Sequence, residues 1–203
     1  MIHVLFIGDG PRDEATVPHL VRPILAVEFV PEFRAWKELR LHRRGHGVGR
    51  KLWYAMTQAR DRNILGLIAT VDSDKAPQRE RLRQLQEARQ QDRAKYAPFP
   101  TALGEACPHL EAWLLDDPVA TRTALQLPAD AQIPTVRETQ SPKNKLQELV
   151  RASPFNRDEH TIIDVLSEIA SYFNASRCRH RSETGFDAFV DDVRREFVSL
   201  MSK

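Results

Sequence analysis

The chain has few cysteines and no long apolar run, and both absences narrow the class of protein. Only two cysteines occur among 203 residues, Cys107 and Cys178, and they form no CxxC motif. This argues against a zinc centre and a disulfide scaffold, and it is typical of a protein of the reducing cytoplasm. No apolar run approaches the ~20 residues needed to cross a bilayer, and the first residues lack the pattern of a signal peptide. We therefore expect a cytoplasmic protein with no membrane partner.

Acidic residues are missing from one long stretch, although the whole chain is nearly neutral. The sequence has 30 lysines and arginines against 28 acidic residues, yet residues 39–60 contain neither aspartate nor glutamate. The densest positive charge of this stretch comes from four residues around a glycine-bearing loop, Arg43, Arg44, Arg50 and Lys51. Segregated positive charge is typical of proteins that bind the phosphate backbone of nucleic acid. A solvated loop without a ligand is the simpler alternative. A second basic cluster at residues 177–181 could likewise either bind nucleic acid or be solvated.

The apolar residues, 41% of the chain, follow a pattern typical of an α/β protein. Short apolar runs at residues 2–7 and 64–71 indicate buried strands, and we expect two more strands at residues 32–41 and 99–107. Helical patterns separate these strands. Because strands that alternate with helices form a parallel sheet with right-handed crossovers, we predict a Rossmann-like α/β domain over residues 1–120.

After residue 120 the pattern changes to amphipathic helices. Apolar stripes with helical spacing occupy residues 143–152, 158–174 and 184–201. We therefore expect a C-terminal helical extension over residues 121–203 that packs on the α/β domain.

Carboxylates directly follow two of the predicted strands. Asp9 lies between two glycines after the first strand, and Asp72 and Asp74 follow the strand at residues 64–71. In an open parallel sheet the ligand crevice lies beyond the carboxyl ends of the strands. Carboxylates gathered there are the ligands that Mg²⁺ prefers. Aspartate is also common in turns without any ligand, but two acidic strand ends together favour a metal site.

Further candidates lie close to these strand ends in the sequence. Asp13 and Glu14 begin a predicted helix, where the helix dipole stabilises a carboxylate, so one of them has a purely structural explanation. A later helix is predicted with Pro108 in its first turn. Glu111 lies among apolar residues of that helix, and we include it in the candidate site. We interpret His109 as a residue of the helix start.

These motifs together resemble the Toprim fold, which topoisomerases, bacterial primases and the nucleases of the overcoming-lysogenization-defect family share. The resemblance rests on an acidic turn after the first strand, a later strand that ends in an Asp-x-Asp pair, a basic glycine loop and a helix start. The segments are Gly8–Glu14, Val71–Asp74, Gly45–Lys51 and Pro108–Leu115, joined by Ser141–Lys143 and the segment around Cys178. The wider pattern is similar, over nearly the whole chain, to a small family with a Toprim-like core, the domain of unknown function 4276.

The resemblance implies a nuclease that uses Mg²⁺ or Mn²⁺ to hydrolyse phosphodiester bonds of nucleic acid. It places Asp9 at the fold's metal-binding or acid–base position, and Asp13, Asp72 and Asp74 at metal-binding positions. The candidate catalytic residues are then Asp9, Asp72, Asp74 and Glu111. The bound metals would lower the pKa of a water that attacks the phosphodiester. The same likeness implies a role in genome defence, as an effector that works with a partner ATPase.

Two alternatives stay open at this point. The fold's first acid is usually glutamate, whereas Asp9 is one methylene shorter, so the chain is also compatible with a catalytically silent subunit that binds a partner ATPase or nucleic acid. The second alternative is a different Mg²⁺ enzyme on a Rossmann-like sheet, such as a phosphatase or a nucleotidyltransferase. A phosphatase with an aspartyl nucleophile would have its Asp-x-Asp pair after the first strand, which this chain lacks. The sequence distinguishes neither DNA from RNA nor one oligomeric state from another.

Overall fold

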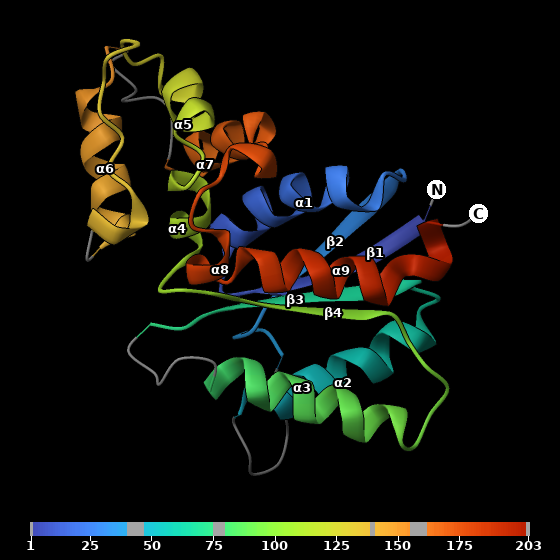
Figure 1. Ribbon diagram of the computed structural model, residues 1–203. Coiled ribbons are helices and arrows are strands. Elements are labelled where there is room, and N and C mark those ends of the chain that lie inside the picture. Colours follow the sequence, from blue (N-terminus) through green and yellow to red (C-terminus); the bar gives the residue numbers. More distant parts are fainter. Residues whose placement is uncertain (1, 40–46, 75–79, 139–140, 155–161, 202–203) are drawn as a thin grey trace.

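The computed structural model has a central parallel sheet with helices on both faces (Figure 1). It describes residues 2–39, 47–74, 80–138, 141–154 and 162–201. The strands are β1 (Ile2–Gly8), β2 (Phe29–Ala35), β3 (Gly66–Asp72) and β4 (Thr101–Ala106). Their order is β2-β1-β3-β4, and every neighbouring pair is parallel. The predicted α/β class with a parallel sheet is confirmed.

Two layers of helices bury the two faces of the sheet. Helices α1 (Pro11–Leu25) and α9 (Phe186–Met201) cover one face, and α2 (Val48–Asp61) and α3 (Glu80–Arg93) cover the other (Figure 1). Because side chains alternate along a strand, Val4 and Phe6 join the hydrophobic cluster under α1 and α9, whereas Leu5 and Ile7 join the cluster under α2 and α3. This burial on both faces explains why β1 is apolar from Val4 to Ile7.

The remaining helices gather beside the carboxyl ends of the strands (Figure 1). They are α4 (Leu110–Leu115), α5 (Pro118–Leu125), α6 (Pro142–Ala152), α7 (Ile162–Tyr172) and α8 (Arg181–Thr184), with 3₁₀ turns at Val136–Glu138 and Ala175–Arg177. Helix α7 packs on α1 and α5, and α6 packs on α4. Leu146, Ile169 and Phe6 belong to one hydrophobic cluster, so these helices share a core with the sheet. Within the described ranges, no helix combines the length and the apolar character that a membrane span requires.

Several predicted boundaries are wrong. The strand expected at residues 32–41 ends at Ala35, because the following residues form a turn in which the Glu38 carboxylate accepts a hydrogen bond from Ala35 N (3.1 Å). The helix expected over residues 184–201 is interrupted at Gly185, which has a φ of 81°. Pro108 lies two residues before α4 instead of in its first turn. The start of the helix expected over 158–174 lies outside the described residues.

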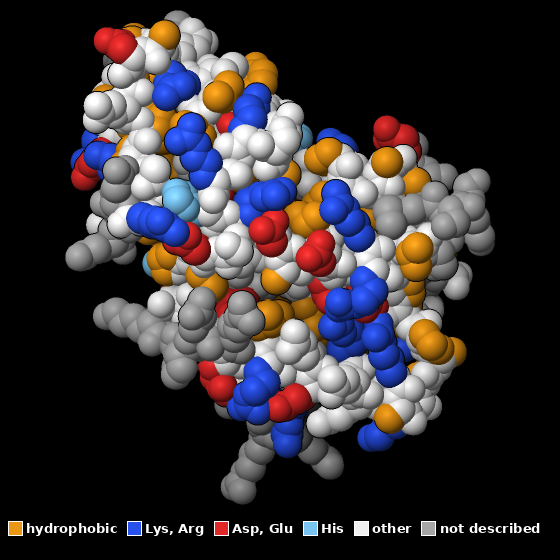
Figure 2. All heavy atoms as spheres, viewed as in Figure 1, with side chains coloured by type: hydrophobic (Ala, Val, Ile, Leu, Met, Phe, Trp, Pro, Cys, Tyr) orange, Lys and Arg blue, Asp and Glu red, His pale blue; other side chains and the backbone are white. Residues whose placement is uncertain are grey.

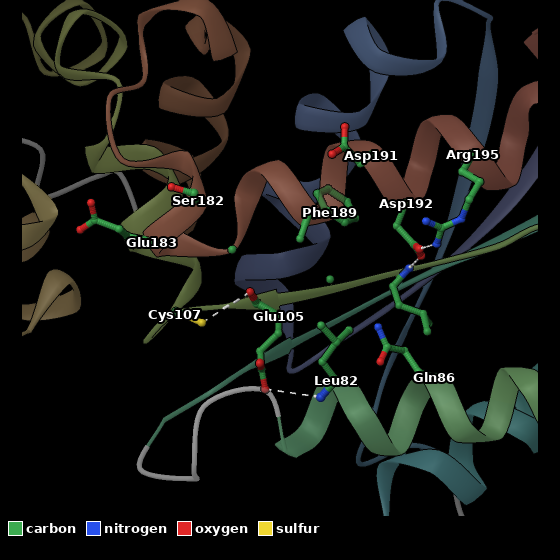
Figure 3. Close-up of a pocket in the computed structure, with 14 residues that line it drawn as sticks. Leu82, Gln86, Glu105, Cys107, Ser182, Glu183, Phe189, Asp191, Asp192 and Arg195 are labelled. Carbon is green, nitrogen blue, oxygen red and sulfur yellow. Dashed lines mark hydrogen bonds and ion pairs between the residues drawn. The ribbon is translucent and has the colours of Figure 1, made fainter.

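Charged side chains from α3 and α9 cover the outer edge of β4. The Asp192 carboxylate accepts a hydrogen bond from Leu103 N (2.8 Å) and pairs with Arg89 (2.6 Å). Arg89 also donates to the carbonyl oxygen of Thr101 (2.8 Å). Figure 3 shows Asp192 reaching β4 from α9, and Glu105 reaching from β4 to the start of α3. Because an uncovered edge strand invites pairing with another chain, these contacts protect the sheet.

Candidate functional site

Adjacent strand ends bring Asp9 and Asp72 together. Asp72 is the last residue of β3, and Asp9 directly follows β1, which is the neighbour of β3 in the sheet. The Asp9 Oδ2 atom accepts a hydrogen bond from the backbone N–H of Asp72 at 3.4 Å. Two of the predicted site residues are therefore in contact at the carboxyl edge of the sheet, where ligands of parallel sheets bind.

Asp13 adds a buried carboxylate from the first turn of α1. Gly10 is the N-cap of α1, while Glu14 is exposed and Asp13 turns inward, with 8% exposure. The Thr70 hydroxyl donates a hydrogen bond to Asp13 Oδ1 (3.2 Å). A Cβ at Gly8 would lie 2.5 Å from the Cβ of Asp13, so the absence of a side chain at Gly8 makes room for this carboxylate. Glu14 is thus the acid with the structural explanation, and Asp13 belongs to the site.

Asp72 lies at the centre of this group. Its Oδ1 atom accepts a hydrogen bond from Leu110 N (2.9 Å), which ties β3 to the start of α4. Burial, followed by the neighbouring carboxylates Asp13, Asp9 and Glu111 in that order, raises the pKa of Asp72 to about 8. Burial, followed by Asp9, raises the pKa of Asp13 to about 6. The carboxylates therefore repel one another strongly while no cation lies between them.

Asp74 and His109 form the other side of the site. Asp74 adopts a φ of 46°, which aspartate tolerates better than most residues, and its backbone N–H donates to the carbonyl of Pro108 (3.1 Å). Its carboxylate pairs with Arg81 (3.0 Å) and with His109 Nε2 (3.2 Å). Ligand atoms of Asp72, Asp74 and His109 all lie within 4.8 Å of one another.

Glu111 is almost fully buried, with 2% exposure, and it faces Asp72 from the first turn of α4. Unlike the central aspartates it has a direct counter-charge, because Arg12 Nη1 donates to its Oε1 at 2.5 Å. The positive charge of Lys143, near the start of α6, lowers the pKa of Asp9, although burial raises that pKa overall. Arg12 of α1 and Lys143 of α6 therefore place positive charge near the carboxylates.

The donor set fits a divalent cation. Among the described residues, no lysine or arginine forms an ion pair with Asp9, Asp13 or Asp72, and burial together with the neighbouring carboxylates raises their pKa values. Carboxylate oxygens of this kind are the usual ligands of Mg²⁺ and Mn²⁺. The imidazole of His109 is a nitrogen donor, which transition-metal ions accept more readily than Mg²⁺ does.

The predicted nucleic-acid-binding loop is described only in part. Arg43 and Arg44 lie outside the described residues. Arg50 is exposed in the first turn of α2, which begins at the same edge of the sheet as the carboxylates because β2 ends there. Lys51 has a structural contact, since its Nζ donates to the carbonyl of Trp36 (2.6 Å). The interface role of these four residues stays a prediction.

Much of the second basic cluster has partners within the chain. Arg177 pairs at 2.7 Å with Asp117, the buried N-cap of α5. Arg181 pairs with Asp187 (3.1 Å). Arg177 holds the segment before α8 against α5, and Arg181 links α8 to α9, so a structural role accounts for these two arginines.

Sequence reasoning missed His109 as a member of the site. The rule that selected Asp9 and Asp72, a polar residue shortly after a strand end, also applies to His109, which follows β4 by three residues. Its interpretation as a helix-start residue is correct, since it is the N-cap of α4, but it leaves out the contact with Asp74.

No family model matches this chain, and neither the curated proteins nor the solved structures include a detectable relative.

Proposed function

We propose that this chain is a Toprim-like, metal-dependent nuclease that hydrolyses phosphodiester bonds of nucleic acid with Mg²⁺ or Mn²⁺ as cofactor. The observation that carries the proposal is the convergence of Asp9, Asp13 and Asp72 at one edge of the sheet without a paired lysine or arginine among the described residues. The resemblance to the Toprim fold requires the acidic turn and the Asp-x-Asp pair to lie side by side, and the order of β1 and β3 in the sheet supports that requirement.

The residues of the site divide the work of holding metal and substrate. Asp72, fixed by Leu110 N, would be the central ligand, with Asp74 and His109 on one side and Asp9 and Asp13 on the other. A bound metal would supply Lewis acidity, which activates a water and stabilises the leaving oxygen. Lys143 and Arg81 lie close enough to influence Asp9 and would attract the phosphate. Glu111 would keep Arg12 in place beside the site.

Replacement of Asp72 tests this proposal directly. Asp72→Ala should abolish Mg²⁺- or Mn²⁺-dependent cleavage of labelled DNA and RNA while circular dichroism shows an intact fold. Asp61→Ala is the matched control, because Asp61 is an exposed aspartate in α2, and it should cleave like the wild type. Cleavage by Asp72→Ala at the wild-type rate would overturn the proposal.

A catalytically silent subunit is the second candidate, and one observation favours it. Arg12 neutralises Glu111, and Arg81 with His109 engages Asp74, so two of the carboxylates have partners without any metal. Asp9 is one methylene shorter than the glutamate that is usual at this position of the Toprim fold, and this also favours a silent subunit. A wild-type protein that binds Mn²⁺ in calorimetry but cleaves no nucleic acid, with or without a partner ATPase, would favour this candidate. The genome-defence role and the ATPase partner are part of the same proposal and rest on the family resemblance alone.

A further inference from the structure

A cavity lies away from the carboxylates, at the far end of α4. It has a volume of about 640 Å³, which is in the range of pockets for small organic ligands. Its walls come from the end of α4, the start of α5, residues 129–135, α6 and residues 179–180. The helix α4 has 6 residues and joins this cavity to the carboxylate site, over about 9 Å of helix axis.

Two guanidinium groups line the cavity and are available to a ligand. Arg122 Nε donates to the carbonyl of Ala131 (3.1 Å), which anchors the guanidinium to the wall while its terminal nitrogens bond to no other described residue. Arg179 is exposed, and within the described part of the chain its guanidinium has no hydrogen bond and no ion pair. Lys145 also lines the cavity, paired with Glu148 at 2.9 Å.

The buried acid of the cavity wall is already engaged by backbone. The Asp116 carboxylate accepts hydrogen bonds from Arg179 N (3.3 Å) and from His180 N (3.0 and 2.9 Å). These bonds hold the 179–180 segment against the end of α4 and so fix the backbone from which the Arg179 side chain extends. Asp130 is the other acid of the lining, so three cations face two acids when His180 is neutral.

Apolar side chains also line the cavity. Leu115 is buried, and Pro118, Ile133 and Pro134 are half-buried around the same cavity. An occupant that contacts both the guanidinium groups and the apolar side chains has a flat apolar body and a compact anionic group. Guanidinium groups bind phosphate with paired hydrogen bonds, and a nucleobase is the flat body most often joined to a phosphate.

We propose that this cavity binds a nucleotide unit, with its phosphate on Arg122 and Arg179 and its base against Pro118, Ile133 and Pro134. The unit is either a free nucleotide or one nucleotide of a strand. The inference does not depend on the nuclease chemistry, because none of these residues belongs to the carboxylate site.

Calorimetry in metal-free buffer tests the proposal with AMP, adenosine and inorganic phosphate as probes. AMP should bind, and adenosine and phosphate should each bind at least about tenfold more weakly. Adenosine lacks the group that contacts the arginines, and phosphate lacks the body that contacts the apolar side chains. Arg179→Ala should weaken AMP binding about tenfold or more, which corresponds to one charge-assisted contact. Arg194→Ala, which removes an exposed arginine of α9 outside the cavity, should leave AMP binding unchanged.

A 5′-phosphorylated dinucleotide separates the two sources of the nucleotide unit. If the dinucleotide binds more tightly than AMP, the cavity holds one nucleotide of a strand. If the dinucleotide binds equally or more weakly, the cavity holds a free nucleotide. Three results would overturn the proposal. Phosphate could bind as tightly as AMP, or AMP could fail to bind at millimolar concentration. Arg194→Ala could also weaken AMP binding as much as Arg179→Ala does. Repeating the titration in Asp72→Ala keeps the result separate from the nuclease proposal, because binding should persist there.

Discussion

Asp72 combines two roles that conflict when no metal is bound. It must stay ionised to hold a cation, yet burial and three neighbouring carboxylates raise its pKa to about 8. Because metal ions compete with protons for such a ligand, metal affinity should rise with pH up to about that value. For the same reason, the stability of the metal-free protein should depend on pH.

The pKa of Asp72 predicts how stability changes with pH. An unfolded aspartate has a pKa near ~4, so the folded state binds the extra proton between that value and about 8. The free energy of unfolding of metal-free protein should therefore fall as pH rises through this window and then level off. Asp72→Asn should remove most of the fall, which melting temperatures between about pH 5 and pH 9 would measure. A wild-type profile as flat as that of Asp72→Asn would contradict the raised pKa, and Asp61→Asn serves as the exposed control.

His109 should decide which metal the site prefers. Its imidazole is the nitrogen donor of the group that also contains Asp72 and Asp74. Nitrogen ligands favour transition-metal ions, so His109→Asn should weaken Mn²⁺ binding about tenfold or more while changing Mg²⁺ binding little. Calorimetric titration of both metals gives the ratio directly. An equal loss for Mg²⁺ and Mn²⁺ would mean that His109 only orients Asp74.

At the scale of elements, α3 is more than a surface helix. Its apolar stripe is thin, yet Arg89 is 7% exposed and links Thr101 of β4 to Asp192 of α9. Arg89→Ala should destabilise the protein by about 3 kcal/mol, because Asp192 loses its buried counter-charge. Arg83→Ala on the same helix should have little effect, since its ion pairs with Glu80 and Glu87 are exposed. Urea unfolding of both variants measures the difference, and equal midpoints would show that the buried pair adds nothing.

The sequence predicted those elements whose burial is uniform. The runs behind β1 and β3 are apolar except for His3 and Thr70 because both faces of these strands are largely covered, so their existence and their acidic ends were predictable. In contrast, β2 is an edge strand with a mixed burial pattern and contains Pro31, and its predicted end was several residues too late. Arg89 could not be assigned from local pattern, because its partner Asp192 lies far away in the sequence. His109 follows a strand end, but its contact with Asp74 could not be read from the sequence.

At the scale of the whole molecule, local ion pairs offset part of the positive charge on the face shown in Figure 2. Figure 2 shows a group of Lys and Arg side chains over the region between α3 and α9, with Asp and Glu side chains interspersed elsewhere on this face. Arg93 and Arg195 of this region pair with Glu196 and Asp192. Local pairing therefore offsets much of that charge, and the basic loop before α2 is the better candidate for contact with a phosphate backbone.

The salt dependence of binding tests that loop. Each phosphate contact contributes about −0.7 to −0.9 to the log–log slope of affinity against salt. Arg43→Ala with Arg44→Ala, made in Asp72→Ala protein so that the nucleic acid is not cut, should flatten the slope by roughly one to two units. Lys51→Ala should instead lower the melting temperature and leave the slope nearly unchanged, because its Nζ is bonded to the carbonyl of Trp36 (2.6 Å). Fluorescence anisotropy with single- and double-stranded DNA and RNA measures the slopes. An unchanged slope in the double variant would assign the loop to solvent or to a protein partner.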